Sequence, residues 1–103
     1  MISVREFVED LKKRGYSVEL NAQIRGRSGQ VHHVDGLAKS HSEDGKRKVV
    51  WNEKRADTTI EIIQTFAIAY DTGAEACYVV NREPVGEERK LAEYYRMRLL
   101  AKV

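Results

Sequence analysis

The feature that most constrains the fold is a continuous apolar run over residues 76–81, which follows a segment with helical periodicity. A strand of this kind is covered on both faces. The segment before it has capping-box spacing at Thr58 and Glu61, and Gly73 stands where a helix C-terminus favours glycine. A helix that crosses between two strands in this way predicts an α/β domain, with a mixed central sheet and helices on both faces.

The remaining periodicities complete this architecture. Ser3 and Glu6 have capping-box spacing ahead of apolar residues at helical intervals, and Gly15 ends that pattern. Alternation and turn residues then predict an antiparallel meander, followed by the long helix, the apolar strand, another helix and a closing strand. The meander strands span 17–21, 31–39 and 47–52, with a turn at 40–45, and the last helix and strand span 87–95 and 97–103. The predicted order is α-β-β-β-α-β-α-β.

Length and composition allow one domain. The chain has 103 residues and 42% hydrophobic content, which suffices for one modest core over residues 1–103. Its single cysteine, Cys77, cannot form an internal disulfide, and no apolar stretch has the length of a signal or membrane segment. We therefore expect a soluble cytoplasmic protein with no membrane partner.

Basic residues gather in short clusters, although the net charge is only +2. Such clusters can follow the phosphates of a nucleic acid even when the net charge is small. The alternative is that they are solvated helix ends and turns. The clusters are Lys12, Lys13 and Arg14; Arg25 and Arg27; Lys46, Arg47 and Lys48; and Arg96 and Arg98.

Asp35 stands inside an apolar strand, where a carboxylate is uncommon because its burial is costly without a metal or a partner. One strand later the chain reaches Lys54. Because strand side chains alternate, Asn52 and Lys54 share one face, while Trp51 and Glu53 share the other. An antiparallel neighbour therefore brings Asp35 beside Asn52 and Lys54. Side chains of Asp35 and Lys54 on opposite faces of the sheet would end this argument.

Several short motifs around this pair occur in an order found in a known family. They are Gly15-Tyr16-Ser17-Val18, Ile24-Arg25-Gly26-Arg27-Ser28-Gly29, His33-Val34-Asp35, Lys54-Arg55, the helix with Phe66, the turn Asp71-Thr72-Gly73-Ala74, and Tyr78-Val79-Val80. Together they resemble the archaeal, Mrr-like branch of the PD-(D/E)xK, restriction-endonuclease-like nuclease superfamily. The resemblance spans nearly the whole chain and implies a restriction-endonuclease-like core.

The resemblance also implies an activity, the hydrolysis of DNA phosphodiester bonds with Mg²⁺ or Mn²⁺. It makes Asp35 a metal ligand and Lys54 the catalytic residue that orients or deprotonates the attacking water. This assignment suits the chemistry, because phosphodiester hydrolysis needs a hard cation on oxygen ligands and a nearby positive charge.

The second acidic ligand of the family falls on Asn52, whose neutral amide binds Mg²⁺ more weakly than a carboxylate. Three alternatives stay open: Asn52 ligates through its oxygen, Glu53 turns inward through a bulge, or Glu61 substitutes from the following helix. Glu61 also has a structural explanation in the capping box with Thr58. Gln64 is expected to face the site near the metal or phosphate, its alternative being an ordinary exposed position.

The first helix of many relatives contributes a glutamate, for which Glu6 and Glu9 are loose substitutes here. DNA contacts are expected from Arg25, Arg27, His33 and Arg55, with His33 on the face of Asp35. Zinc is disfavoured, because His32, His33, His41 and Cys77 are scattered rather than paired.

We expect DNA as the partner and a homodimer as the assembly, because so small a domain has no recognition module of its own. An additional protein partner is a further option. One alternative function is a catalytically degenerate nuclease-like domain that binds nucleic acid or a protein. Another is an unrelated α/β interaction domain, in which Asp35 and Lys54 are incidental.

Overall fold

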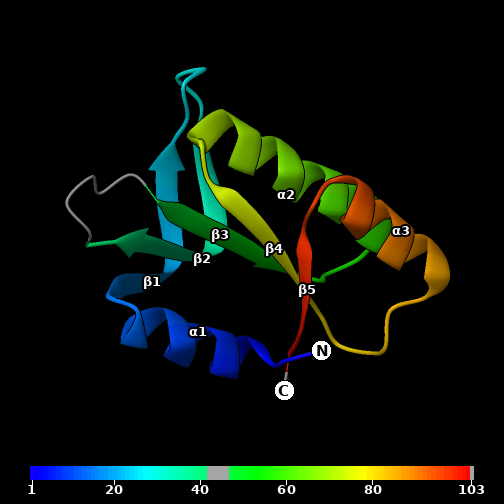
Figure 1. Ribbon diagram of the computed structural model, residues 1–103. Helices are drawn as coiled ribbons and strands as arrows, with labels where there is room; N and C mark the ends of the chain where they lie inside the picture. Colours follow the sequence, from blue (N-terminus) through cyan, green and yellow to red (C-terminus); the bar gives the residue numbers. More distant parts are fainter. Residues whose placement is uncertain (42–46, 103) are drawn as a thin grey trace.

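The computed structural model describes residues 1–41 and 47–102, so most of the turn predicted at 40–45 lies outside the described residues. Within them, five strands form one mixed sheet in the order β1-β2-β3-β4-β5, and three helices pack against it (Figure 1). β1, β2 and β3 are antiparallel neighbours, and β4 and β5 continue the sheet in parallel. The elements are α1 (Val4–Lys13), β1 (Tyr16–Arg25), β2 (Val31–Ser40), β3 (Lys48–Glu53), α2 (Thr58–Thr72), β4 (Glu75–Val80), α3 (Gly86–Tyr94) and β5 (Arg98–Ala101).

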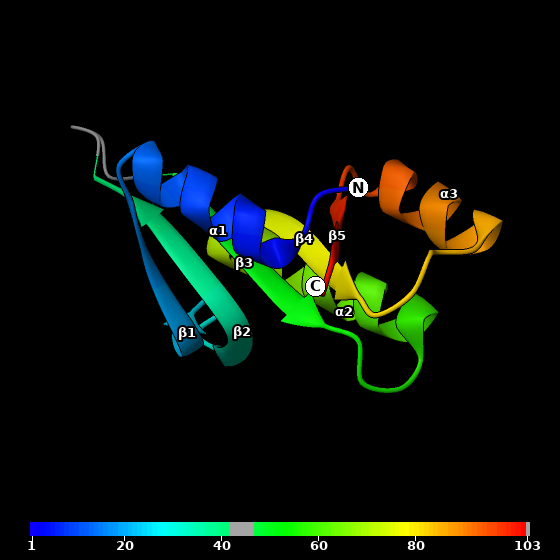
Figure 2. The same ribbon diagram turned by 90° about the horizontal axis from the view of Figure 1, so that it is seen from below.

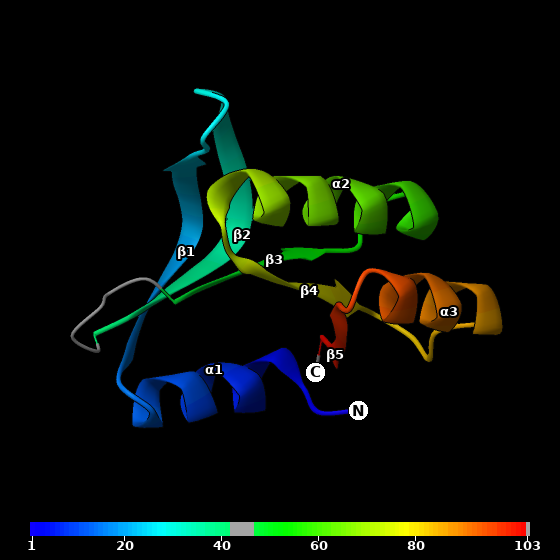
Figure 3. The same ribbon diagram turned by 45° about the horizontal axis from the view of Figure 1, so that its top comes forward.

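The helices cover both faces of the sheet. Figures 2 and 3 show α1 across one face, with α2 and α3 on the other. Phe7 of α1 packs with Trp51 and Leu100 in the core beneath α1. Ile62 of α2 and Ala92 of α3 belong to a second core on the opposite face. The predicted α/β class, mixed sheet and two-sided covering are therefore confirmed. No described helix is long and apolar enough to cross a membrane.

Of the helix caps predicted at Ser3, Thr58 and Gly73, the first and the last are correct. Ser3 caps α1, and its hydroxyl accepts a hydrogen bond from a first-turn N–H at 3.1 Å. Gly73 ends α2 in the left-handed region, with φ of 69°. The capping box predicted at Thr58 is wrong, because the N-cap is Asp57, whose carboxylate accepts from the backbone N–H of Ile60 at 3.1 Å. Aspartate caps as well as threonine does, and Thr58 therefore lies inside the helix.

β1 extends beyond the predicted strand at 17–21, and its two halves contribute side chains to opposite faces of the sheet. Tyr16 and Val18 pack against the core beneath α1, whereas Ala22 and Ile24 belong to the core beneath α2. Strict alternation would put all four on one side. The reversal occurs at Asn21, which has a left-handed φ of 51°, a conformation that asparagine tolerates better than most residues. The alternation of inward and outward residues therefore breaks in the middle of β1. For this reason the sequence pattern did not predict the second half of the strand.

β2 reverses at the same level as β1. Val34 and Leu37 both belong to the core beneath α2, although they are three residues apart. Gly36 lies on the α1 side against Trp51, where an added Cβ would meet the indole ring at 1.8 Å. The residue at the reversal is Asp35. Its side chain is therefore not placed by simple alternation from the rest of the strand.

Candidate functional site

Asp35 faces a pocket of about 510 Å³ on the α1 side of the sheet. Glu53, from the end of β3, faces the same pocket. Two carboxylates on neighbouring strands thus share one opening with Arg55, which follows β3. The lining residues are Val4, Arg5, Val8, Glu9, Lys12, Leu20, Asn21, Asp35, Trp51, Glu53 and Arg55.

Both carboxylate oxygens of Asp35 accept hydrogen bonds. Arg55 donates to Oδ1 at 2.5 Å and to Oδ2 at 2.9 Å, and the backbone N–H of Glu53 donates to Oδ2 at 2.7 Å. Burial alone raises the pKa of Asp35, but these hydrogen bonds and the charge of Arg55 outweigh it and lower the pKa. Asp35 is therefore an ionised carboxylate at neutral pH. Its side chain is only 10% exposed, whereas that of Arg55 is 64% exposed and can move.

Glu53 and Glu9 bring further carboxylates to the pocket. The Glu53 side chain is 38% exposed, and its nearest ion-pair partner is Lys102, at 3.8 Å. Glu9 of α1 lines the same opening and pairs with Arg5 at 3.7 Å. Glu6 is different, since it accepts from the hydroxyl of Ser3 and is not among the lining residues. Of the two glutamates expected from the first helix, Glu9 is thus the one that reaches the pocket.

Asn52 lies in a different environment from the pocket. Its Oδ1 accepts from the backbone N–H of Asp35 at 3.0 Å, and its Nδ2 donates to Oγ1 of Thr65, on α2, at 3.2 Å. The amide therefore ties β2 and β3 to the helix on the far side of the sheet. The prediction of Asn52 as a metal ligand does not fit this arrangement, because its oxygen is already engaged with the backbone.

Lys54 does not meet Asp35. Its ammonium donates to the carbonyl of Ala56 at 3.3 Å, and its charge is one of the influences that lower the pKa of Glu61, at the start of α2. Lys54 thus lies toward α2, while Asp35 faces the α1 side. Among the described residues no hydrogen bond or ion pair joins Lys54 to Asp35, so the structure gives no support to the predicted Asp35–Lys54 pair. The reversal at Asp35 is the physical reason, since alternation assigned Asp35 to the face of Asn52.

Glu61 holds the loop between β3 and α2. Its carboxylate accepts from the backbone N–H groups of Arg55 at 2.8 Å and Ala56 at 2.7 Å, and from the hydroxyl of Tyr78 at 2.8 Å. Burial raises the pKa of Glu61, but the two backbone hydrogen bonds and that of Tyr78 outweigh it and lower the pKa. Every contact of this carboxylate supports the chain itself, so the metal role predicted for Glu61 does not fit either.

The remaining predicted site residues divide between the two faces. Gln64 is exposed on α2 and is not among the residues that line the α1-side pocket, as in the alternative of an ordinary exposed position. His33 is exposed on the Asp35 side, and its charge helps to lower the pKa of Asp35. Arg25 donates to the carbonyl of Gly29 at 2.8 Å, within the β1–β2 turn.

Arg27 has a structural partner at the C-terminal end of α2. It donates to the carbonyls of Tyr70 and Asp71, and its guanidinium lies 5.7 Å from the Tyr70 ring centre. Asp71 completes this anchor, accepting from the N–H and hydroxyl of Ser28 at 2.8 and 2.6 Å and pairing with His32 at 2.7 Å. The Ser28 and His32 contacts lower the pKa of Asp71 to about 2. The hairpin tip is therefore fastened to α2, and none of these anchoring residues lines the Asp35 pocket.

The role of Arg55 as the partner of Asp35 was not predicted from the sequence. Arg55 was expected only to contact DNA, and the signal that could have found its role is the two-residue spacing from Glu53. Alternation puts Glu53 and Arg55 on the same side, opposite Asn52 and Lys54. The candidate site residues on and after β3 are therefore Glu53 and Arg55 rather than Asn52 and Lys54.

The donor set of the pocket suits a magnesium-like ion that keeps much of its water. Among the described residues, no group of three or more His, Cys, Asp or Glu side chains is placed to hold a metal. Magnesium, however, is usually held by one or two carboxylates, with water and substrate phosphate as the other ligands. Asp35 and Glu53 provide such a pair. Arg55 must leave Asp35 for Oδ1 to become free, while Oδ2 keeps the hydrogen bond from the Glu53 N–H.

Comparison with known proteins gives a fold likeness only. No protein-family model and no curated protein matches the sequence. A crystal structure described as that of a protein of unknown function, AF1548, matches with a TM-score of 0.66 and 16% sequence identity. The match covers 92% of this chain and 54% of that one, so this chain spans about half of its length. At this identity the likeness supports the α/β fold and carries no activity with it.

Proposed function

We propose that the α1-side pocket is the active site of a metal-dependent nuclease that hydrolyses DNA phosphodiester bonds. The observation that carries the proposal is the convergence of Asp35 and Glu53, from neighbouring strands, on one pocket with Arg55. The sequence resemblance to the restriction-endonuclease-like nucleases supports it. In this form the acidic pair is Asp35 with Glu53, and Arg55 takes the place expected of Lys54.

Asp35 and Glu53 would hold Mg²⁺ or Mn²⁺, which supplies an electrophile for the phosphate oxygens and lowers the pKa of a bound water. The chain's own residues have separate tasks. Asp35 is kept ionised by Arg55 and by the Glu53 N–H, so it needs no proton loss before it binds a cation. Arg55 is exposed enough to turn from Asp35 to an incoming phosphate, where its two donors suit a phosphodiester.

DNA is the substrate we propose, with a homodimer as the assembly. A single pocket on a small domain supplies one cleavage centre and few base contacts, so symmetry would supply the second strand's contacts. His33, on the Asp35 side, is a candidate phosphate contact beside the pocket. Size measurement in solution, with and without duplex DNA, tests the assembly.

Cleavage assays test the site. Supercoiled, linear, branched and single-stranded DNA are incubated with the protein in Mg²⁺ or Mn²⁺. We expect Asp35→Asn and Glu53→Gln each to reduce cleavage by about a hundredfold or more, because each removes a charged metal ligand. Lys54→Ala is the matched control beside Arg55→Ala, and only the Arg55 change is expected to reduce the rate strongly.

The outcomes separate the two site assignments. Loss of cleavage in Lys54→Ala, with normal cleavage in Arg55→Ala, would restore the pair predicted from alternation. Cleavage that survives both carboxylate changes would place the active site elsewhere. Circular dichroism and thermal unfolding of each variant verify that a lost activity is not a lost fold.

One observation favours a second candidate, a degenerate nuclease-like domain that binds nucleic acid or a protein without cleaving. Arg55 engages both oxygens of Asp35, an arrangement that competes with metal binding. Salt-sensitive DNA binding without cleavage in either metal would support this candidate. Cleavage that depends on Asp35 would remove it.

A further inference from the structure

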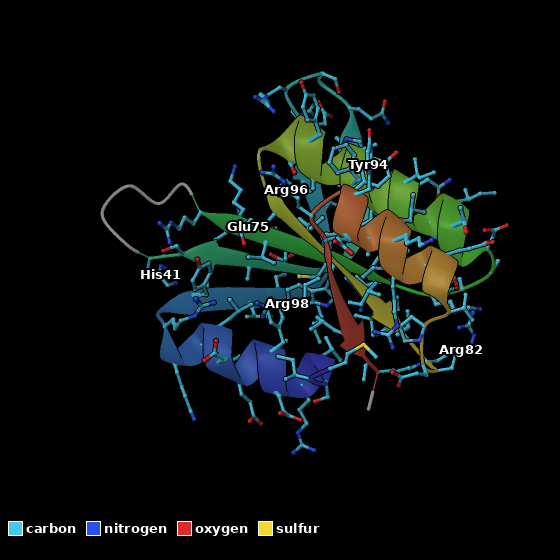
Figure 4. The ribbon with its side chains drawn as sticks, turned by 45° about the vertical axis from the view of Figure 1, so that its right-hand side comes forward. His41, Glu75, Arg82, Tyr94, Arg96 and Arg98 are labelled. Carbon is cyan, nitrogen blue, oxygen red and sulfur yellow. The ribbon has the colours of Figure 1, made fainter. Side chains whose placement is uncertain are left out.

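A second pocket lies at the opposite end of the sheet, where β5 stops short. β5 pairs with β4 only from Cys77 onward, so Glu75 and Ala76 at the start of β4 pair with β3 on one side and have no β5 residue on the other. An opening of about 470 Å³ surrounds this uncovered edge and extends to residues of α1 and α2. Figure 4 shows Glu75, Arg96 and Arg98 near the start of β4. This pocket shares no lining residue with the Asp35 pocket.

Arginines from four segments line this second pocket. Arg14 ends α1, Arg47 precedes β3, Arg96 follows α3 and Arg98 begins β5. Glu75 is the only acid among the described lining residues. Arg14 pairs with Asp10, but within residues 1–41 and 47–102 no salt bridge reaches the other three arginines. The pocket therefore carries positive charge that the described residues do not neutralise.

Aromatic rings stand beside these arginines. Phe66 of α2 and Tyr95 after α3 have ring centres 4.5 Å apart, and Tyr70 follows at 6.3 Å from Phe66. All three line the pocket, and Tyr70 is 72% exposed. Tyr16 lines it as well, with the guanidinium of Arg14 at 5.7 Å from its ring centre. Aromatic rings beside guanidinium groups are the combination that binds bases and phosphates together.

The floor of the pocket does not suggest catalysis. Cys77 lies there, but burial raises the pKa of its thiol to about 12, so it stays protonated at neutral pH. A binding role therefore suits the pocket better than a nucleophilic one.

We propose that this second pocket binds a nucleotide unit, with its phosphate on the arginines and its base against the aromatic rings. The nucleotide comes either free in solution or from a single strand of nucleic acid. Four arginines on separate segments can reach more than one phosphate oxygen, and a guanidinium fits a phosphate through two donors. The proposal stands independently of the nuclease proposal, because it uses neither a metal nor the Asp35 pocket.

Binding measurements in EDTA test the proposal. Fluorescence anisotropy follows a labelled short single-stranded oligonucleotide, a duplex of the same sequence serves as a comparison, and calorimetry follows adenosine monophosphate and inorganic phosphate. Binding of the mononucleotide and of the strand supports a free nucleotide as a source; binding of the strand alone identifies the polymer. Duplex binding as tight as single-strand binding, phosphate binding as tight as nucleotide binding, or no binding at all would overturn the proposal.

Two substitutions distinguish binding in this pocket from nonspecific attraction between the nucleotide and surface charge. Arg47→Glu reverses an exposed charge at the pocket and should weaken binding about tenfold or more. Lys90→Glu, on an exposed position of α3 outside the pocket, makes the same charge change and should alter binding less than about twofold. Equal losses in the two variants would overturn the proposal. The binding measurements are made in EDTA without cleavage, so this test can succeed or fail whatever happens to the nuclease proposal.

Discussion

The two sides of the sheet at the end of β3 treat polar side chains differently. Toward α2, the Asn52 amide, the Thr65 hydroxyl, the Glu61 carboxylate and the Tyr78 hydroxyl form one chain of hydrogen bonds through side chains and backbone. The hydrogen bonds of these groups all go to other groups of the protein. Such a network fixes the positions of β3 and α2 relative to each other.

Toward α1, the polar groups meet solvent in a pocket. Asp35 is held, but by an arginine that is itself mostly exposed, and Glu53 has only a distant partner in Lys102. Successive residues of one strand thus divide into a structural set and a set free to take a ligand. A polar residue at the end of β3 is therefore informative about function only when a ligand can replace its partners within the protein.

Of the changes that test this comparison, removal of the Glu61 carboxylate should have the largest effect on the free energy of unfolding. Glu61→Ala leaves two backbone N–H groups and Tyr78 without their shared acceptor, so we expect a loss of about 2–3 kcal/mol in the free energy of unfolding. Urea unfolding measures it, with Glu93→Ala on exposed α3 as the control. A loss no larger than in the control would mean that the network carries little stability.

Asn52→Asp sharpens the comparison further. Restoring the family's acidic residue should not increase cleavage, because the side chain at this position reaches toward Thr65 rather than into the Asp35 pocket. The new carboxylate also loses the donor to Thr65, so we expect a cost of about 1–2 kcal/mol in unfolding free energy. Cleavage and urea unfolding are measured on the same preparation. A rise in metal-dependent cleavage would contradict the division of the two sides.

Arg55→Ala should change stability by less than about 1 kcal/mol, because the arginine is largely exposed and such ion pairs contribute little. Its effect on ligand binding should be larger. Freed from Arg55, Asp35 should bind Mn²⁺ more tightly, which calorimetry detects, while cleavage falls. Arg5→Ala, in the same pocket but without a contact to Asp35, is the control. Unchanged Mn²⁺ affinity would argue that Arg55 does not compete with a metal.

The smallest expected effect is the dependence of the unfolding free energy on acid pH. Folding lowers the pKa of Asp35 and of Glu61 below the ordinary values of 3.8 and 4.5. Groups of this kind stabilise the fold above their unfolded pKa, and the stabilisation is lost as pH falls through the lower folded value. Unfolding free energy should therefore decline from about pH 5 downward, and less steeply in Glu61→Gln than in the parent chain. Parallel declines in both proteins would remove Glu61 from the explanation.

Much of the fold was accessible from the sequence, because its signals are local. The cap at Ser3, the left-handed Gly73 and the apolar run of β4 each follow from neighbouring residues. The second half of β1 was not accessible. A single left-handed residue, Asn21, exchanges the buried face in mid-strand, and no periodicity survives such a change.

The candidate site was predicted in part. Asp35 and Glu53 were both named as metal ligands, and both face the pocket in which we propose the metal site. Asn52 and Lys54 were assigned to the site from the spacing of a motif, and Glu61 and Gln64 from the resemblance to relatives. Neither source can reveal that β2 reverses at Asp35. Which polar groups are satisfied by the chain is decided by tertiary contacts, above all those of α2 with β3.

The left-handed turn of the backbone at Asn21 makes the hairpin sensitive to length in one half only. Ala22 and Ile24 belong to the core beneath α2, so an insertion at the tip would disturb the contacts of Ser28 with Asp71 but leave the pairing of these two residues with β2 in place. A single residue added or lost between Val18 and Asn21 would instead shift the pairing of β1 with β2 and exchange inward for outward positions. Leu20 and Asn21, which line the pocket beside Asp35, are the residues that such a shift would displace. The chain can therefore change in length at its exposed end, and has almost no freedom to do so beside its carboxylate.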